Sequence, residues 1–401
     1  MKKRYNLFNL LYDVVNLVFI FTLYNDNFFV EKFGPLSLRV VFAVFIILNL
    51  RRMYKNITNR VLLKQLIPFL VFLLLSLSSL MINPGTNDPT KLTNNLLLLI
   101  SMFVITVCYI NYNFDKVLYM VWVVILSSVI ILAFNSTINK WTFRKTGGTA
   151  DPNEFATQLL AFSMISIYLF RKNRNYIFVS ISAMAFLYGL FQAASLSSFL
   201  AAFVLGIFIL IKYLRFAFTK SIITVTILAV VGIFAFISLQ DKILDIQAID
   251  NVLGRTEKTG TAKTRFQSWN AGLNMLVDKP ILGVGMNNYA VNSPKYTREN
   301  LSQDSVAPHN IYLKSLAESG LIVFLSLVIF LFDMLTKYFR TIVNSDYFWI
   351  YLAVVAFLLM GFTLGLNYNK YLWLTFALLM NVHNQIYHHY KLIRLNKIQE
   401  S

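Results

Sequence analysis

The sequence predicts an all-α protein that crosses a membrane about twelve times, with one large polar loop outside the membrane. Hydrophobic residues make up 57% of the 401 residues and charged residues only 13%, which is about half the charged fraction of a soluble domain. Apolar runs of roughly 16 to 22 residues recur along the chain, long enough to cross the hydrocarbon core as helices. These observations exclude a soluble globular protein.

The apolar runs divide the chain into three parts. We expect transmembrane helices one to nine in residues 1–239, an extracytoplasmic loop in 240–310, and helices ten to twelve with a cytoplasmic tail in 311–401. The expected spans are 7–24, 34–50, 61–82, 92–112, 117–134, 155–170, 176–191, 196–211, 221–239, 311–334, 347–366 and 371–387. The first run lacks a small-residue cleavage site, so we interpret it as a retained signal anchor.

Basic residues set the expected orientation, because the cytoplasmic segments of membrane proteins are enriched in Lys and Arg. With a cytoplasmic N-terminus, 19 of the 36 basic residues fall in short inward segments. Most outward loops are then nearly free of basic charge, so both termini should be cytoplasmic. The distribution of basic residues between the two membrane faces therefore accounts for the net charge of +18, and we exclude nucleic-acid binding.

Two outward loops are basic nonetheless. One carries Arg144 and Lys145, and the long loop carries Arg255 and Arg265 among eight basic residues. Long loops cross the membrane regardless of charge, which remains an alternative explanation for the lysines. The guanidinium fork of arginine binds phosphate oxygens through two parallel hydrogen bonds. We therefore expect an anionic ligand at the outer face.

The long loop contains a predicted amphipathic helix that starts near Arg265. Four apolar residues recur on one of its faces at three- and four-residue spacing: Phe266, Trp269, Leu273 and Leu276. We expect Thr264 to cap its start and Asp278 to mark its end. Such a helix would lie along the membrane interface with Trp269 at headgroup depth. The alternative is a lid helix with a snorkelling arginine.

Two further segments border the long loop and its neighbour. His309 is the only histidine expected on the outer face, where an imidazole can exchange a proton near neutral pH; a structural histidine is the alternative. Lys314, one turn past Asn310, either snorkels or joins a phosphate site. In the other basic loop, residues 146–154 read as a glycine-rich turn in which Asp151 or Asn153 caps the next helix.

The order of these motifs resembles the bacterial O-antigen ligase and Wzy-type polysaccharide polymerase superfamily. The resemblance covers roughly residues 145–325 and rests on five motifs: Gly148-Thr-Ala-Asp-Pro-Asn153-Glu-Phe-Ala156, Arg265-Phe-Gln-Ser-Trp269, Pro280-Ile-Leu-Gly283-Val-Gly285, His309-Asn310-Ile-Tyr-Leu313 and Glu318-Ser-Gly-Leu321. One departure stands out. Where the family has Ser-Arg after the seventh span, this chain has Ser197-Ser198-Phe199, so Arg144 or Arg255 would have to replace that arginine.

The resemblance implies a GT-C-like, inverting glycosyltransferase of the bacterial cytoplasmic membrane that needs neither metal nor cofactor. Its donor would be a glycan on undecaprenyl diphosphate, with membrane lipid, a flippase and a chain-length regulator as further partners. Arg265 corresponds to the arginine that binds diphosphate and His309 to the histidine that activates the acceptor hydroxyl, with Asp26, Glu31 and Asp304 as reserve bases. We expect substrate contacts from Arg255, Arg144, Lys145, Asn153, Asn310, Lys314 and Trp269.

Three functions remain compatible with these features. The first is a polymerase that joins capsule or exopolysaccharide repeat units. The second is a ligase that passes finished glycan to a different acceptor, which would use the same donor and site. The third is a non-enzymatic flippase or transporter of lipid-linked oligosaccharide, which would need charged side chains lining a path through the membrane.

Overall fold

The computed structural model describes residues 7–83, 89–134, 138–139, 144–145, 148–149, 151–193, 195–214, 261–297, 308–364 and 369–399. Helices dominate these ranges, as the sequence predicts. The N-terminal part contains α1 (Leu7–Tyr24), α2 (Asp26–Phe33), α3 (Pro35–Thr58), α4 (Arg60–Ile82), α5 (Pro89–Tyr109) and α6 (Phe114–Phe134). A two-stranded antiparallel ribbon of β1 (Ile138–Asn139) and β2 (Arg144–Lys145) follows.

The remaining described helices fall into two groups. The first contains α7 (Pro152–Asn173), α8 (Tyr176–Ala193) and α9 (Leu196–Leu214). The second contains α12 (Thr261–Asp278), α13 (Tyr289–Asn292), the 3-10 helix η1 (Ser293–Tyr296), α14 (Ile311–Thr336), α15 (Phe339–Val343), α16 (Phe348–Met360) and α17 (Lys370–Gln399).

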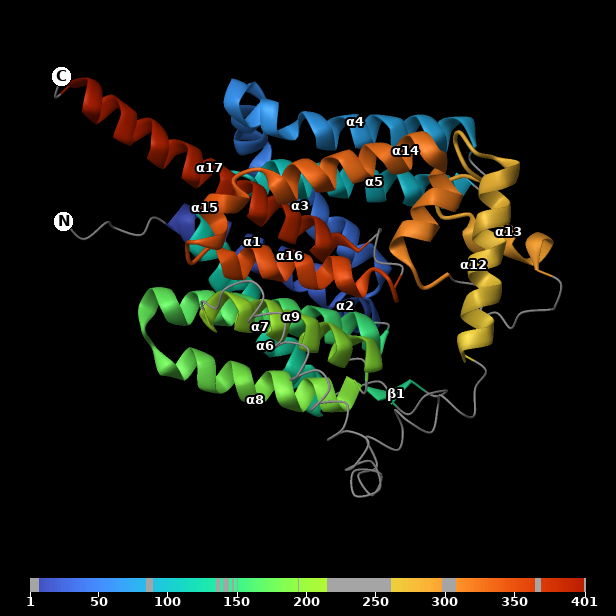
Figure 1. Cartoon of the computed structure of the whole chain (residues 1–401), viewed down its shortest axis with the longest axis horizontal. Coiled ribbons are helices and arrows are strands. Elements are labelled where there is room, and N and C mark those ends of the chain that lie inside the picture. The colour runs from blue at the N-terminus through green and yellow to red at the C-terminus, as the bar shows by residue number, and fades with distance from the viewer. Residues whose placement is uncertain are drawn as a thin grey trace.

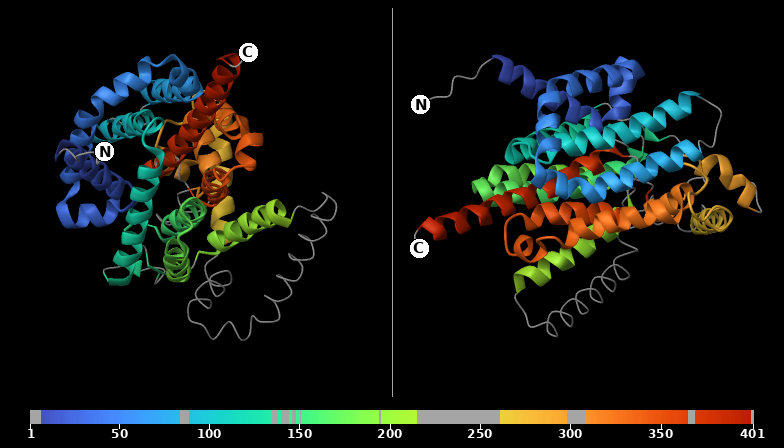
Figure 2. Two further views of the ribbon diagram at one scale, coloured as in Figure 1. Left: turned by 90° about the vertical axis from the view of Figure 1, so that its left-hand side faces the viewer. Right: turned by 90° about the horizontal axis from the view of Figure 1, so that it is seen from above.

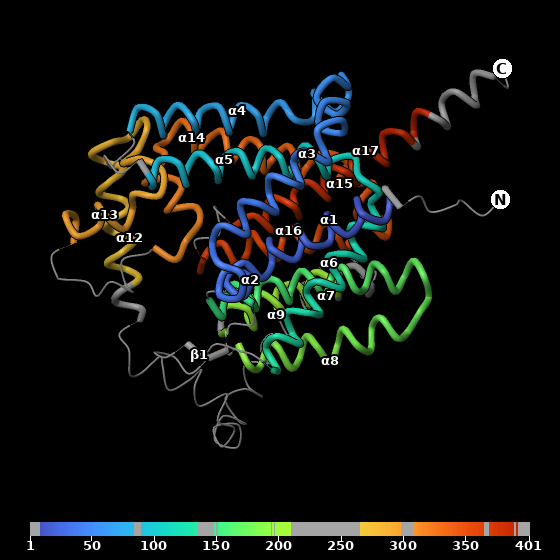
Figure 3. The backbone as a smooth tube through the Cα atoms, turned by 180° about the vertical axis from the view of Figure 1, so that it is seen from behind, coloured from blue at the N-terminus to red at the C-terminus, as the bar shows by residue number. Residues whose placement is uncertain are grey.

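The long helices run side by side, and α12 crosses one end of them (Figure 1). Helix α14 packs on α4, α17 on α5, and α16 on α7, which also contacts α8. Helices α12 and α13 lie at the end opposite to the one where α1 begins and α17 ends (Figures 1 and 3, and the right-hand view of Figure 2). The segment between α9 and α14 that the structure describes therefore gathers at one end of the bundle.

The bundle core is rich in packed aromatic rings. Phe69 and Phe72 of α4 pack against Trp373 of α17, with ring centroids 5.5 and 5.7 Å apart. Phe330 of α14 stacks on the same indole at 6.3 Å. Such pairs contribute about 0.5 to 1.5 kcal/mol each beyond area burial. Direct packing of this kind holds helices together where lipid removes the hydrophobic driving force.

The helices support a polytopic membrane protein, whereas the expected count of twelve spans is not reached. Five described helices are long and apolar enough to cross a membrane: Arg60–Ile82, Thr90–Tyr109, Phe114–Phe134, Tyr176–Ala193 and Ile311–Thr336. The count is six if α2 and α3, bent by 114°, form one broken span. Further apolar helices, such as Phe348–Met360, are shorter than a span. The expected span 221–239 lies outside the described residues.

The predicted large polar loop also requires correction. Residues 240–260 and 298–307 lie outside the described ranges, and the rest of 240–310 is largely helical. Helix α12 starts at Thr261 and ends at Asp278. The predicted C-terminal end is therefore confirmed, whereas Thr264 lies within the first turn and does not cap the helix. The three-part division of the chain stays a prediction.

Candidate functional site

Two motifs that are separate in sequence interlock in the structure. Helix α14 is broken at Gly320, where φ is 75° and ψ −179°, and the 280–285 turn fits into the break. The amide of Val284 donates to the carbonyl of Ala317 at 3.0 Å, and that of Gly285 to the carbonyl of Glu318 at 2.8 Å. The amide of Leu321 donates back to Pro280 at 2.7 Å. The turn thereby satisfies backbone groups that the break would leave unpaired.

Glycine is required at this interlock for both space and conformation. Gly283 has a φ of 66°, and a Cβ there would lie 2.4 Å from the carbonyl carbon and oxygen of Glu318. A Cβ on Gly320 would lie 2.3 Å from the carbonyl oxygen of Ile281. Positive φ also disfavours any residue with a Cβ. Gly283 and Gly285, with φ values of 66° and 99°, therefore form a tight turn.

Polar side chains of α4 and α5 hold the turn from the other side. Ser79 donates its hydroxyl to the carbonyl of Leu282 at 2.8 Å, and Asn95 donates to that of Met286 at 3.1 Å. The ammonium group of Lys91 donates to Asn288 at 2.9 Å. The turn is thus bonded to both α4 and α5 as well as to α14.

Helix α12 packs against Tyr289 and α14 through a face other than the one that its apolar periodicity predicted. Ala271 and Met275 are fully buried against Tyr289, whose hydroxyl donates to the carbonyl of Ser268. The backbone amide of Tyr289 in turn donates to the buried carboxylate of Glu318 at 3.1 Å. By contrast, Phe266 and Leu273 of the predicted apolar face are 62% and 48% exposed. That exposure fits a helix lying along a membrane surface, which stays a prediction.

His309 lies between two fixed residues. The indole Nε1 of Trp269 donates to the carbonyl of Pro308 at 2.8 Å, which ties the approach to His309 to α12. On the other side, the side chain of Asn310 caps α14 by accepting from the amides of Tyr312 and Leu313, both at 3.0 Å. His309 itself adopts a φ of 44°, a conformation uncommon outside glycine and found at functional sites when neighbouring structure imposes it.

The start of α7 forms the opposite side of the site. Asp151 caps this helix, as predicted, by accepting from the amide of Asn153 at 2.6 Å. The preceding loop contacts α2, because Phe28 donates its amide to Gly148 at 3.2 Å. A Cβ on Gly148 would lie 2.0 Å from the side-chain oxygen of Asn25. The loop therefore approaches α2 so closely that only glycine fits.

Glu154, in the first turn of α7, lies at the centre of a charged cluster. Burial, together with the charges of Asp151 and Asp26, raises the pKa of its carboxyl to about 7, although a hydrogen bond with Asn369 and the charge of Lys314 oppose this rise. Glu154 therefore titrates near neutrality, the range in which a carboxyl can exchange protons during catalysis. Its contacts bring together the N-terminal ends of α2, α7, α14 and α17.

Arg265 extends from α12 towards the same cluster. Its charge interacts with that of Asp151, while burial lowers the pKa of its guanidinium. The Nε atom is shielded from solvent and has no hydrogen-bond partner within the described ranges. A buried N–H donor without an acceptor is costly unless an anion takes it. The structure thus brings Arg265, Asn153 and Lys314 to one cluster.

Other predicted site residues are placed less fully. Arg144 and Lys145 form β2, opposite Asn139 and Ile138 respectively, and Arg255 and Asp304 lie outside the described residues. Among the residues described, no group of three or more His, Cys, Asp or Glu side chains is arranged to hold a metal ion. The substrate-binding and catalytic roles assigned from the sequence stay predictions.

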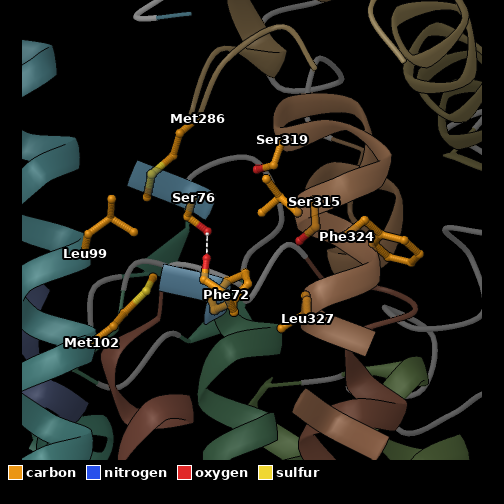
Figure 4. Close-up of a pocket in the computed structure, with 10 residues that line it drawn as sticks. Phe72, Ser76, Leu99, Met102, Met286, Ser315, Ser319, Phe324 and Leu327 are labelled. Atoms are coloured by element: carbon orange, nitrogen blue, oxygen red, sulfur yellow. Dashed lines mark hydrogen bonds between the residues drawn. The ribbon is translucent and has the colours of Figure 1, made fainter. Parts of the chain in front are cut away.

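A small cavity lies between α4, α5 and α14, next to the 280–285 turn. Ser76, Met286, Ser315 and Ser319 face it from α4, the turn and α14, and the hydroxyl of Ser76 donates to the carbonyl of Phe72 (Figure 4). Its volume of about 20 Å³ is enough for about one water molecule. A space of this size cannot hold a sugar.

Sequence reasoning missed Glu154 and Lys370 as site residues. Glu154 stands within a motif that was recognised, but a carboxylate in the first turn of a helix has an ordinary explanation in the helix dipole. Asp26 was named only as a reserve base, and the structure places it within interaction distance of Lys370. Only the packing of α2, α7 and α17 reveals that these charges share one site.

Comparison with known families matches one part of the chain. Residues 181–328 match the family described as O-Antigen ligase. This match supports the O-antigen ligase and Wzy-type superfamily for that segment. The matched segment contains Arg265, Trp269, His309 and Lys314, whereas Glu154 precedes it. A comparison with curated proteins finds no matching sequence. The match supports a glycosyltransferase-like membrane enzyme.

Proposed function

We propose that this protein is a polymerase of capsular or exopolysaccharide repeat units. It transfers glycan from undecaprenyl diphosphate to an acceptor sugar hydroxyl at the outer face of the bacterial cytoplasmic membrane. One observation carries the proposal: the shielded guanidinium of Arg265, with its unpartnered Nε, stands beside the cluster around Glu154. An anion-binding group and proton-exchanging groups therefore meet at one end of the bundle.

The chemistry follows from these groups. The acceptor hydroxyl oxygen attacks the anomeric carbon of the donor sugar and inverts it, while the bond from that carbon to the diphosphate oxygen breaks. The diphosphate leaves with the bonding electrons, and Arg265 stabilises the developing charge, with Lys314 as a second cation. His309 takes the hydroxyl proton as general base. Glu154, with its pKa of about 7, is a second group able to accept it.

The placement of charges supports an enzyme rather than a carrier. A carrier needs ionisable groups that line a path through the membrane. In the structure Asp13 pairs with Lys116, and the carboxylate of Asp333 lies 4.0 Å from the ammonium group of Lys337, the residue that follows α14. The Glu318 carboxylate accepts a backbone amide from Tyr289. These acidic groups are engaged at fixed positions, whereas the cluster around Glu154 lies at one end of the bundle.

The departure at Ser198 favours polymerase over ligase. The family has an arginine at this place, whereas Ser198 is fully buried and donates its hydroxyl to that of Ser195 at 2.9 Å. The diphosphate must then be held by other cations than in a ligase with the complete motif. A different donor geometry is more consistent with joining repeat units than with passing finished glycan to a distinct acceptor.

The test is an assay of purified protein in liposomes with an undecaprenyl-diphosphate-linked repeat unit. Chain growth and released lipid diphosphate are measured for the wild type, His309→Ala and Arg265→Ala, without added metal. We expect longer glycans from the wild type only, and donor binding that survives in His309→Ala. Transfer of the substrate across the bilayer without growth or diphosphate release would refute the proposal in favour of a carrier. Transfer of whole glycan to a different acceptor would favour a ligase.

A further inference from the structure

A groove with mainly apolar walls lies between α1, α3 and α5. Its volume is about 600 Å³. The apolar lining comes from Phe19, Leu23, Pro35, Leu38, Phe42, Ala43, Ile46, Leu97, Leu98 and Ile100. Helix α3 contacts both α1 and α5, and the tube view shows it crossing between them (Figure 3). The groove is far larger than the cavity next to the 280–285 turn.

The groove carries positive charge where the helices begin. Arg39, in the second turn of α3, is exposed and donates to the side-chain oxygen of Asn94 at 3.5 Å. Lys370, the first residue of α17, also lines the groove. Within the described ranges no carboxylate forms an ion pair with Arg39. Two cations therefore lie beside an apolar space, which is the pattern that an amphiphilic anion requires.

The apolar part extends away from those charges along α3. Ile46 lines the groove two turns beyond Arg39, about 10 Å further along the helix axis at 1.5 Å per residue. Ile100 of α5 lies opposite, also beyond Asn94 in its own helix. The groove thus has a charged end and an apolar end, which match the phosphate group and the hydrocarbon chain of a lipid phosphate.

The charged end is continuous with the candidate site. Lys370 lies within interaction distance of Asp26, and its neighbour Asn369 forms a hydrogen bond with Glu154. A phosphate held between Arg39 and Lys370 would therefore be adjacent to the cluster that Arg265 joins through Asp151. Neither Arg39 nor Lys370 lies in the segment matched to the family.

We propose that this groove binds the isoprenoid chain of a polyprenyl diphosphate, with Arg39 and Lys370 as ligands of its phosphates. The inference rests on the proposed function, because it identifies the groove as the place where the lipid of the donor lies. The apolar walls bind the chain at about 0.8 kcal/mol per buried methylene. The two cations select a diphosphate over an uncharged chain through charge-assisted hydrogen bonds.

Photo-crosslinking tests the proposal directly and without turnover. The full-length protein in lipid nanodiscs is irradiated with a benzophenone-bearing isoprenyl diphosphate, and the labelled peptides are mapped by mass spectrometry. We expect labels on α3 and α5. Ala43→Trp fills the groove and should lower labelling about tenfold, whereas Val44→Trp, at an exposed position of α3 outside the groove lining, should not. Arg39→Gln should lower it about tenfold, whereas Arg51→Gln at the far end of α3 should not.

Competition separates the sources of the ligand. Unlabelled isoprenyl diphosphate should displace the probe, whereas phosphatidylglycerol at the same concentration should not. Equal displacement by both would overturn the proposal, because the groove would then be a general lipid contact. Labels outside the groove, or equal labelling of Ala43→Trp and Val44→Trp, would also overturn it. Chain growth by an Ala43→Trp variant at the wild-type rate would refute the groove while leaving the proposed polymerase intact.

Discussion

The carboxyl of Glu154 provides a quantitative test of the charged cluster. Its folded-state pKa of about 7 exceeds the ordinary value of 4.5, so the folded protein binds this proton more tightly than the unfolded chain does. The resulting stability is fully present below pH 4.5 and is lost as the pH rises to about 7. The difference corresponds to a loss of up to about 3 kcal/mol in the free energy of unfolding. Glu154→Gln keeps the shape of the side chain and removes this dependence.

The measurement is thermal unfolding of the purified protein in detergent at pH 4.5 and pH 8.5. At pH 8.5 we expect a higher unfolding midpoint for Glu154→Gln than for the wild type, and at pH 4.5 nearly equal midpoints. Glu31→Gln is the matched control, because Glu31 is exposed on α2 and should show neither difference. A wild-type midpoint no lower at pH 8.5 than that of Glu154→Gln would refute the raised pKa and with it the cluster.

Three further outcomes follow from the geometry of the site. Gly283→Ala should lower the free energy of unfolding by about 2 to 5 kcal/mol, from positive φ and overlap with Glu318. Gly206→Ala should not lower it, because an added Cβ there would have no atom within 4 Å. Equal unfolding midpoints for the two variants would contradict the fit of the 280–285 turn into the break of α14. Trp269→Phe should reduce turnover about fivefold, since it removes the hydrogen bond to Pro308 beside His309; an unchanged kcat would count against this positioning role. Asn310→Ala should cost about 1 kcal/mol of stability, and calorimetry showing no loss would argue against the cap.

The helical architecture could be predicted because apolar length is a local property of the chain. Each apolar run outside 221–239 coincides with a helix in the structure. The number of spans was harder, since several of these helices fall short of the length and hydropathy that a span requires. Thr264 failed as a cap for a related reason. The helix begins earlier, at Thr261. The spacing of apolar residues, from which its start was predicted, identifies only the amphipathic part of the helix.

The site could be predicted in part. A residue was identified when its type has no common structural role at its position, and it was missed when it has one. Arg265 and His309 stood out because basic and titratable groups are rare outside a membrane protein's inward segments. Glu154 and Asn310 both occupy helix starts, where polar side chains have an ordinary structural role; Glu154 was missed, and the substrate contact of Asn310 stays a prediction. Asn310 was predicted to bind substrate, and its side-chain oxygen caps α14. Glu154 was passed over as a helix-start carboxylate, and packing of four helix ends raised its pKa to about 7.

The interlock of the 280–285 turn with the break in α14 explains why motifs of little individual specificity are informative together. The turn alone is an ordinary glycine turn, and Gly320 alone is an ordinary helix irregularity. Their three backbone hydrogen bonds fix α12, through Asp278 and Pro280, relative to α14. Arg265 projects from α12 and His309 precedes α14, so the same bonds set the distance between the expected anion-binding and proton-accepting groups. The glycines therefore act on the chemistry by positioning, without touching the substrate.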